Sequence, residues 1–182
     1  MFLLSGGIII LTFLGSIMNY FQITKCDLKN GDGIRVVLWV AGCSHHCKGC
    51  HNPYTWDCNA GLPFTDETKS ELFEALNKDY IAGITFSGGD PLFCSNRNTV
   101  AELIKEIKTK FPQKTIWLYT GYTYEELKDF EEIKPVLSNI DVIVDGEFVE
   151  ALKDVNYHWA GSTNQRVLRK NDPIRCGERD ND

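Results

Sequence analysis

Four short runs rich in β-branched and aromatic residues alternate with amphipathic segments, and this alternation constrains the fold more than any other feature of the sequence. The runs are RVVLWV (35–40), GITF (83–86), TIWLYT (115–120) and DVIVDG (141–146). The first run is apolar on both faces, as a buried parallel strand requires. Strands that alternate with helices form a parallel sheet with right-handed crossovers, so we expect an α/β fold.

The segments between these strands carry helix signals. In FTDETKSELFEALNK (64–78), Thr65 is placed to cap the amino end of a helix. A second stripe of apolar residues at helical spacing stops before Pro112, which cannot continue a helix. Thr123 and Glu126 have the spacing of a capping box. These signals predict three helices, each placed between two predicted strands.

Glycine-rich or polar residues follow each predicted strand. In an open parallel sheet, ligands bind beyond the carboxyl ends of the strands. We therefore expect four segments to meet at one edge of the sheet and to form the functional site: the cysteine-containing loop after residue 40, Gly88-Gly89-Asp90, Thr120-Gly121-Tyr122 and Asp145-Gly146.

Three cysteines, Cys43, Cys47 and Cys50, lie within eight residues in the first of these loops. Thiolates are soft ligands for zinc or for iron–sulfur clusters. A structural zinc site needs four ligands, and a nearby histidine could supply the fourth. Zinc ligands usually come as two pairs, and no second CxxC pair occurs in the sequence. An iron–sulfur cube held by three thiolates leaves one iron open to an exogenous molecule, so the triplet favours a cluster over zinc.

The CxxxCxxC spacing, followed one strand later by SGGDP (87–91), resembles the radical S-adenosylmethionine (SAM) superfamily. Within it, the chain is similar to the anaerobic ribonucleoside-triphosphate reductase-activating proteins, which are short relatives of the pyruvate formate-lyase activases. The similarity covers Met18 to about Arg169. It rests on MNYFQITKCDLKNGDGIRVVLWVAGC (18–43), CHNPYTW (50–56), IWLYTGY (116–122), DVIVDGEF (141–148) and GSTNQRV (161–167). One departure is Asp32, which stands where the family's NGPGxR motif has proline.

This resemblance implies an incomplete (β/α) barrel of the radical SAM type that carries a [4Fe-4S] cluster and SAM. Cys43, Cys47 and Cys50 would bind the cluster. The SAM site would comprise Gly49, Cys50 and His51 near the adenine, Gly88, Gly89 and Asp90 at the methionine amine, Thr120 and Gly121 near the ribose, and Asp145 close to the same pocket. No further catalytic side chain is implied, because the cluster and SAM supply the radical.

The implied activity is the generation of a glycyl radical on the large subunit of an anaerobic (class III) ribonucleoside-triphosphate reductase. An electron donor such as flavodoxin or ferredoxin would reduce the cluster. Two alternatives stay open: another radical SAM enzyme, either a pyruvate formate-lyase-type activase or a protein like 7-carboxy-7-deazaguanine synthase, and a zinc-binding module without catalysis. Radical hydrogen abstraction needs no general base, so we interpret His45 and His46 as loop residues.

Composition bounds the rest. The net charge is -6 without a dense run of Lys or Arg, which argues against nucleic acid as a ligand. Clustered cysteines favour a reducing, cytoplasmic setting. We expect one activase domain at 18–170 and a disordered tail at 171–182. Residues 1–17 are apolar and uncharged; we interpret them as the product of an upstream start choice, with a membrane-associating segment or additional folded structure as alternatives.

Overall fold

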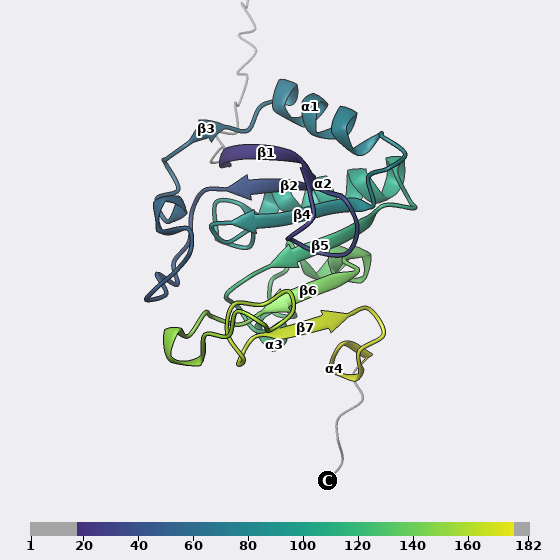
Figure 1. Cartoon of the computed structure of the whole chain (residues 1–182). Coiled ribbons are helices and arrows are strands. Elements are labelled where there is room, and N and C mark those ends of the chain that lie inside the picture. Colours follow the sequence, from purple (N-terminus) through teal and green to yellow (C-terminus); the bar gives the residue numbers. More distant parts are fainter. Residues whose placement is uncertain (1–17, 177–182) are drawn as a thin grey trace, which may run out of the picture.

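The computed structural model describes residues 18–176, so the expected N-terminal extension lies outside the described residues. One open sheet of seven strands forms its centre, in the order β3-β1-β2-β4-β5-β6-β7 (Figure 1). The strands are β1 (Asn19–Asp27), β2 (Arg35–Val40), β3 (Leu62–Pro63), β4 (Gly83–Gly88), β5 (Thr115–Tyr119), β6 (Val142–Asp145) and β7 (Arg166–Arg169).

The four central strands β2, β4, β5 and β6 are parallel neighbours. They coincide with the four runs picked out in the sequence, so the predicted α/β class and parallel core are confirmed. Val36 of β2 pairs with Ile84 of β4, and Ile84 in turn pairs with Ile116 of β5. This register brings the carboxyl ends of all four strands to the same edge of the sheet.

Three antiparallel strands were not anticipated from the sequence. β1 pairs with β2, β3 pairs with β1, and β7 pairs with β6. β1 is mostly half-buried without regular alternation, and its pairing with β2 has two irregularities, so it lacks the period-two pattern that marks a strand. These antiparallel pairs make the sheet mixed. β3 and β7 form its two edges and do not pair with each other, so the sheet is open.

The predicted helices are present as α1 (Asp66–Leu76), α2 (Arg97–Lys110) and α3 (Tyr124–Leu127). Thr65 caps α1 by accepting a hydrogen bond from the backbone of Thr68, and Thr123 with Glu126 forms the expected capping box of α3. α2 ends two residues before Pro112. The remaining short helices are η1 (Pro53–Thr55), η2 (Lys134–Asn139), η3 (Glu150–Leu152) and α4 (Pro173–Cys176).

The two faces of the parallel sheet differ in chemistry. On the face covered by the helices, alternate strand residues such as Leu38, Phe86 and Leu118 are fully buried in one apolar core. Figure 1 shows α2 behind the sheet on this side. Because successive strand side chains point to opposite faces, the intervening residues line the other face. Many of these residues are polar or aromatic, namely Arg35, Thr85, Ser87, Trp39, Trp117 and Tyr119, and the rest include the buried valines Val37, Val142 and Val144.

A buried arginine organises the amino end of that second face. Arg35 is fully buried and donates to the hydroxyl oxygens of Thr85 (2.8 Å) and Thr115 (2.9 Å), and to three backbone carbonyls. Its guanidinium lies 5.4 Å from the ring centre of Trp117. Burial lowers the pKa of Arg35 to about 10, since each of these acceptors is neutral. Gly31 must be glycine here, because a Cβ would lie 2.8 Å from Trp117.

The described part of the C-terminal segment folds back onto the sheet. The Asp32 carboxylate pairs with Arg169 of β7 at 2.9 Å, so the residue that departs from the family motif makes an exposed ion pair. Arg175 in α4 donates to the backbone carbonyls of Leu137 and Ile140. Within the expected disordered tail, residues 171–176 carry the short helix α4 and are mostly exposed, and 177–182 lie outside the described residues. Across residues 18–176, no helix has the length and apolar character needed to cross a bilayer.

We predict that Arg35→Met lowers the free energy of unfolding by about 2–4 kcal/mol, because it leaves several buried oxygens without a donor. Urea denaturation followed by circular dichroism would measure this loss. The matched control is Arg169→Met, which removes an exposed ion pair and should cost about 1 kcal/mol or less. Equal losses in the two variants would show that the buried guanidinium contributes nothing specific.

Candidate functional site

The loops that follow the four parallel strands meet at the carboxyl edge of the sheet, as the sequence predicts. Asp90, after β4, accepts a hydrogen bond from the backbone nitrogen of Gly121, after β5, at 2.9 Å. The imidazole of His45, after β2, contacts both Asp90 and Glu147, and Glu147 follows β6. Four segments that are distant in the sequence therefore form one continuous site.

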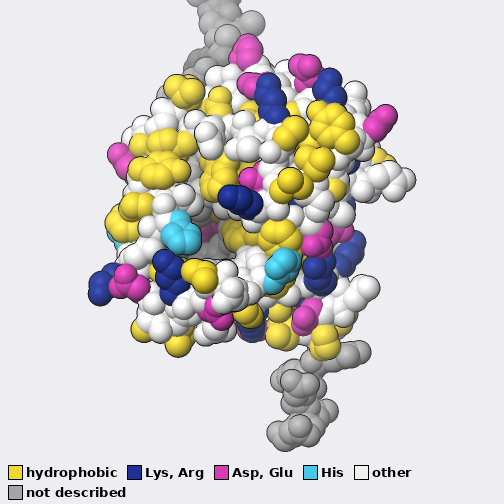
Figure 2. Space-filling model, in the orientation of Figure 1, with side chains coloured by type: hydrophobic (Ala, Val, Ile, Leu, Met, Phe, Trp, Pro, Cys, Tyr) yellow, Lys and Arg dark blue, Asp and Glu magenta, His cyan; other side chains and the backbone are white. Residues whose placement is uncertain are grey.

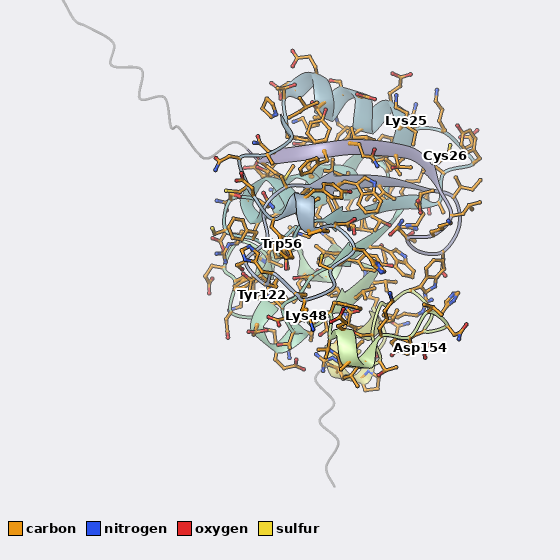
Figure 3. The ribbon with its side chains drawn as sticks, turned by 60° about the vertical axis from the view of Figure 1, so that its left-hand side comes forward. Lys25, Cys26, Lys48, Trp56, Tyr122 and Asp154 are labelled. Atoms are coloured by element: carbon orange, nitrogen blue, oxygen red, sulfur yellow. The ribbon has the colours of Figure 1, made fainter. Side chains whose placement is uncertain are left out.

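The cysteine loop after β2 holds three free, half-buried thiols: Cys43, Cys47 and Cys50. Its start is fixed by the backbone of Gly42, which donates to the carbonyl of Thr55 at 2.7 Å. Its end is a tight turn in which the nitrogen of Cys50 donates to the carbonyl of Cys47 at 3.1 Å. In Figure 3 this loop is marked by Lys48, on the same side of the molecule as Trp56 and Tyr122.

The thiols are close enough to influence each other electrostatically. Burial, with smaller contributions from the charges of Asp90 and Cys47, raises the pKa of Cys43 to about 11. Burial likewise raises the pKa of Cys47, with a contribution from Cys50. Three thiolates would repel one another in this loop, and a bound cationic centre reverses that cost by stabilising the deprotonated forms.

The donor set fits an iron–sulfur cluster better than a single ion. Within residues 18–176, no three Cys, His, Asp or Glu side chains come together closely enough to hold one metal ion. The loop instead offers three soft sulfur donors, none of them in a disulfide. Thiolates are the ligands of iron–sulfur clusters, so Cys43, Cys47 and Cys50 are the residues that could hold such a group.

A cavity of about 560 Å³ lies beside this loop, over the polar and aromatic face of the sheet. This volume suits a small-molecule ligand. Cys47, Cys50 and His51 form one side of it, and the segment 148–165 forms another. Trp39, Ser87 and Tyr119 contribute the sheet side. Figure 2 shows the hollow on this face, with a histidine on either side of it.

Cys43 borders a different hollow from the other two cysteines. That second hollow, of about 540 Å³, is also lined by His46, Trp56, Cys58 and Phe93. The rings of His46 and Trp56 stack at 4.7 Å. The cysteine loop thus separates two open spaces, and only the larger lies over the central strands.

Asp90 is a buried hub of hydrogen bonds rather than an open carboxylate. It is 2% exposed. Thr120 donates its hydroxyl to Asp90 at 3.0 Å, and the backbone nitrogens of Gly121 and Leu92 donate at 2.9 and 2.8 Å. The Nε2 atom of His45 adds a fourth donor at 3.0 Å. In this arrangement both carboxylate oxygens are engaged by the protein, and a contact with a ligand amine stays a prediction.

Gly88 and Gly89 allow this hub to sit against the cysteine loop. Gly88 has a φ of 103°, and a Cβ there would lie 2.8 Å from the backbone of Val40. A Cβ on Gly89 would lie 2.5 Å from the carbonyl oxygen of Gly42. The glycine pair therefore serves a close approach between two backbones, those of the β2 and β4 loops.

His45 is the residue of the site that sequence reasoning missed, because it was interpreted as a simple loop residue. Its Nδ1 lies 2.8 Å from a carboxylate oxygen of Glu147, and its Nε2 lies 3.0 Å from Asp90. The hydrogen bond to Asp90, assisted by Glu147, raises the pKa of His45 to about 9. The imidazolium therefore donates from both nitrogens at neutral pH. No spacing rule marks such a residue, since its partners come from other strands.

Asp145 is enclosed by protein donors. It is 1% exposed, accepts from the backbone nitrogen of Tyr124 at 2.7 Å, and is paired with Arg166 of β7. Arg166 also contacts Glu125 at 2.7 Å. Asp145 thus joins α3 to β7, and its expected place near a ligand stays a prediction. Arg166 belongs to the GSTNQRV segment, and its ion pairs with Asp145 and Glu125 give this segment a structural role.

The outer wall of the cavity is built by residues 148–165. Phe148 lies 6.0 Å from His51, ring centre to ring centre, across the cysteine loop. Gly49 has a φ of 76°, and a Cβ there would lie 2.8 Å from Glu150, which keeps the loop tight against this wall. Trp159 has a φ of 67°, and its buried indole nitrogen has no hydrogen-bond partner among the described residues. Aromatic residues in a long loop carry no specific signal, so this wall was not predicted.

Comparison with known proteins assigns the family. The model of a 4Fe-4S single cluster domain matches residues 29–168. The anaerobic ribonucleoside-triphosphate reductase-activating protein of Enterobacteria phage T4 is 45% identical over 157 residues, 86% of this chain and 97% of the phage protein. The chain belongs to the family of anaerobic ribonucleoside-triphosphate reductase-activating proteins. The proteins of that name from Vibrio cholerae and Escherichia coli K12 are 42% and 43% identical, covering 84% and 82% of this chain and 98% and 97% of their own.

The match to the 4Fe-4S single cluster domain includes the cysteine loop and the four parallel strands, and it ends in β7. Family membership and the donor chemistry of the loop therefore agree. The recognition made from the sequence motifs is confirmed by these comparisons.

We predict that Thr120→Val lowers the free energy of unfolding of the cluster-free protein by about 1–3 kcal/mol, because Asp90 loses a charge-assisted hydrogen bond while staying buried. Urea denaturation would measure it. Thr120→Ser is the matched control: it keeps the hydroxyl donor and should retain most of the stability. If both variants lose the same amount, the hydrogen bond to Asp90 is not what Thr120 contributes.

Proposed function

We propose that this protein is a radical SAM activating enzyme that generates a glycyl radical on the large subunit of an anaerobic ribonucleoside-triphosphate reductase. The observation that carries the proposal is the loop of three free, half-buried cysteines beside a cavity of about 560 Å³ on the polar face of a parallel sheet. The relatives named above are activating proteins of such reductases, which supports the same target for this chain.

Cys43, Cys47 and Cys50 would hold the [4Fe-4S] cluster. When bound, the reduced cluster and SAM together supply the 5′-deoxyadenosyl radical that abstracts hydrogen from the target glycine. A cluster held by these three thiolates would keep one iron available for SAM, which accounts for a loop with three cysteines and not four.

The cavity is suited to position SAM. His51 and Phe148 offer flat rings beside the cysteine loop, where an adenine could stack. Trp159 lines the same cavity. Asp90, Gly88 and Gly89 fix the loop edge above the sheet.

The sheet of the described residues is open, and the incomplete barrel of the radical SAM type stays a prediction. A sheet that ends at β3 and β7 leaves one side accessible, and a glycine-bearing segment of the reductase could enter there. Positioning that segment against the SAM 5′ carbon is the main contribution that the protein scaffold can make. A small electron-transfer protein such as flavodoxin or ferredoxin would reduce the cluster.

We predict that anaerobic reconstitution with iron and sulfide gives a brown protein with about four irons per chain. Dithionite-reduced protein should then cleave SAM to 5′-deoxyadenosine, measured by chromatography. A colourless protein that binds one zinc tightly would exclude the cluster and favour a zinc-binding module.

The target is tested by incubating the reconstituted full chain with SAM, dithionite and an anaerobic ribonucleotide reductase under exclusion of oxygen. A glycyl-radical doublet in the electron paramagnetic resonance spectrum is expected. Cys47→Ala should abolish it, while Cys26→Ala, which removes an exposed thiol of β1, should retain it. An intact cluster that cleaves SAM without producing the doublet would point to a different substrate.

A further inference from the structure

His45 joins the cysteine loop to two other loops through a bridge of three side chains, His45, Asp90 and Glu147, which we call the His45 bridge. The two ring nitrogens point to carboxylates on opposite sides, at 3.0 Å for Asp90 and 2.8 Å for Glu147. Asp90 follows β4 and Glu147 follows β6, so one imidazole spans the edge of the central sheet.

The ring is enclosed by packing as well as by hydrogen bonds. Its side chain is 10% exposed. A Cβ on Gly121 would lie 2.4 Å from the His45 ring, so the ring sits directly on that glycine. The ring of Tyr122 meets it edge-on, with the ring centres 4.6 Å apart. The position of His45 is therefore determined by the loops after β4, β5 and β6 together.

The neighbouring contacts of the cysteine loop are weaker. Lys48 pairs with Glu150 while its own side chain is 90% exposed, and the exposed Ser44 meets the hydroxyl of the half-buried Tyr122 at 3.5 Å. His46 stacks on Trp56 but is exposed. Exposed contacts of this kind add little, whereas the charge-assisted contact of the largely buried His45 ring with the buried Asp90 carboxylate holds the loop firmly.

We infer that His45 is a positioning residue that fastens the middle of the cysteine loop to the sheet edge. It lies between Cys43 and Cys47 in the sequence, so fixing its ring restricts where both thiols can lie before any cluster is bound. The inference rests on the proposed function only in naming the cluster as the group that these thiols hold.

The first test is amide hydrogen exchange of the reduced, cluster-free full chain, measured by mass spectrometry on peptides that cover residues 42–50. His45→Ala should speed exchange there by about tenfold, because the loop loses its buried attachment and opens locally. Glu147→Ala should speed it by a smaller factor, since one of the two hydrogen bonds remains. His45→Gln keeps one N–H donor and should fall between wild type and His45→Ala.

The matched control is His46→Asn, a change in the same loop at a residue that does not contact Asp90. Asparagine tolerates the φ of 48° found at this position. Its exchange in residues 42–50 should stay within about twofold of wild type. Peptides from α1 should exchange equally in every variant, which separates a loosened loop from a destabilised fold. Because Glu147 is exposed, Glu147→Ala keeps the test informative if His45→Ala fails to fold.

A second readout uses the reconstituted protein. Iron loss to a chelator should be faster in His45→Ala than in His46→Asn, and the g-values of the reduced cluster should shift only in the former. Unchanged exchange and unchanged iron loss in both His45→Ala and Glu147→Ala would overturn the inference. The inference would also be overturned if His45→Ala changed the KM for SAM and left hydrogen exchange, iron loss and g-values unchanged. His45 would then affect only the binding of SAM next to Asp90, and not the position of the cysteine loop.

The exchange measurement needs neither SAM nor a reductase. It can therefore fail while the proposed activity stands, and it can succeed in a protein that activates nothing. The two proposals are separately testable.

Discussion

Asp90 carries a carboxylate that is 2% exposed at the carboxyl edge of the sheet, and a charge this deeply buried is unfavourable unless donors surround it. Its donors come from its own loop, from Thr120 and Gly121 after β5, and from His45 in the cysteine loop. Satisfying one charge therefore fixes three loops relative to one another. The cysteine loop, which contributes the thiols, depends on this arrangement for its place above the cavity.

The opposite end of the same sheet face depends on a complementary interaction. Arg35 is buried at the amino ends of the strands and donates to hydroxyl and carbonyl oxygens. The buried cation of Arg35 is thus satisfied by neutral acceptors at one end of the strands. The buried anion of Asp90 is satisfied by donors at the other end. The aromatic side chains of Trp39 and Tyr119 line the cavity between these two ends, next to Lys29.

The sequence was informative wherever a signal is local. Strand runs, the Thr65 cap, the stop before Pro112 and the capping box at Thr123 depend on neighbours within a few residues, and each is found as predicted. The antiparallel strands β1, β3 and β7 were not predicted, because their residues show no regular alternation of apolar and polar side chains. They become strands by pairing with neighbours in the sheet. The cavity wall at 148–165 was not predicted for a similar reason, since its aromatic residues can be assigned to a cavity only once they are seen to face the sheet.

Local pattern and chemical type thus predicted the α/β class and the edge of the sheet at which the loops converge, because spacing and side-chain chemistry are properties of short segments. The same spacing singled out the three thiols as candidate ligands, and that role stays a prediction. The partners of buried charges were settled only in three dimensions. Asp90 meets His45 across 45 residues and Thr120 across 30, and His45 meets Glu147 across 102. Hydrogen bonds require contact within about 3 Å, and only the packing of distant strands brings these groups so close.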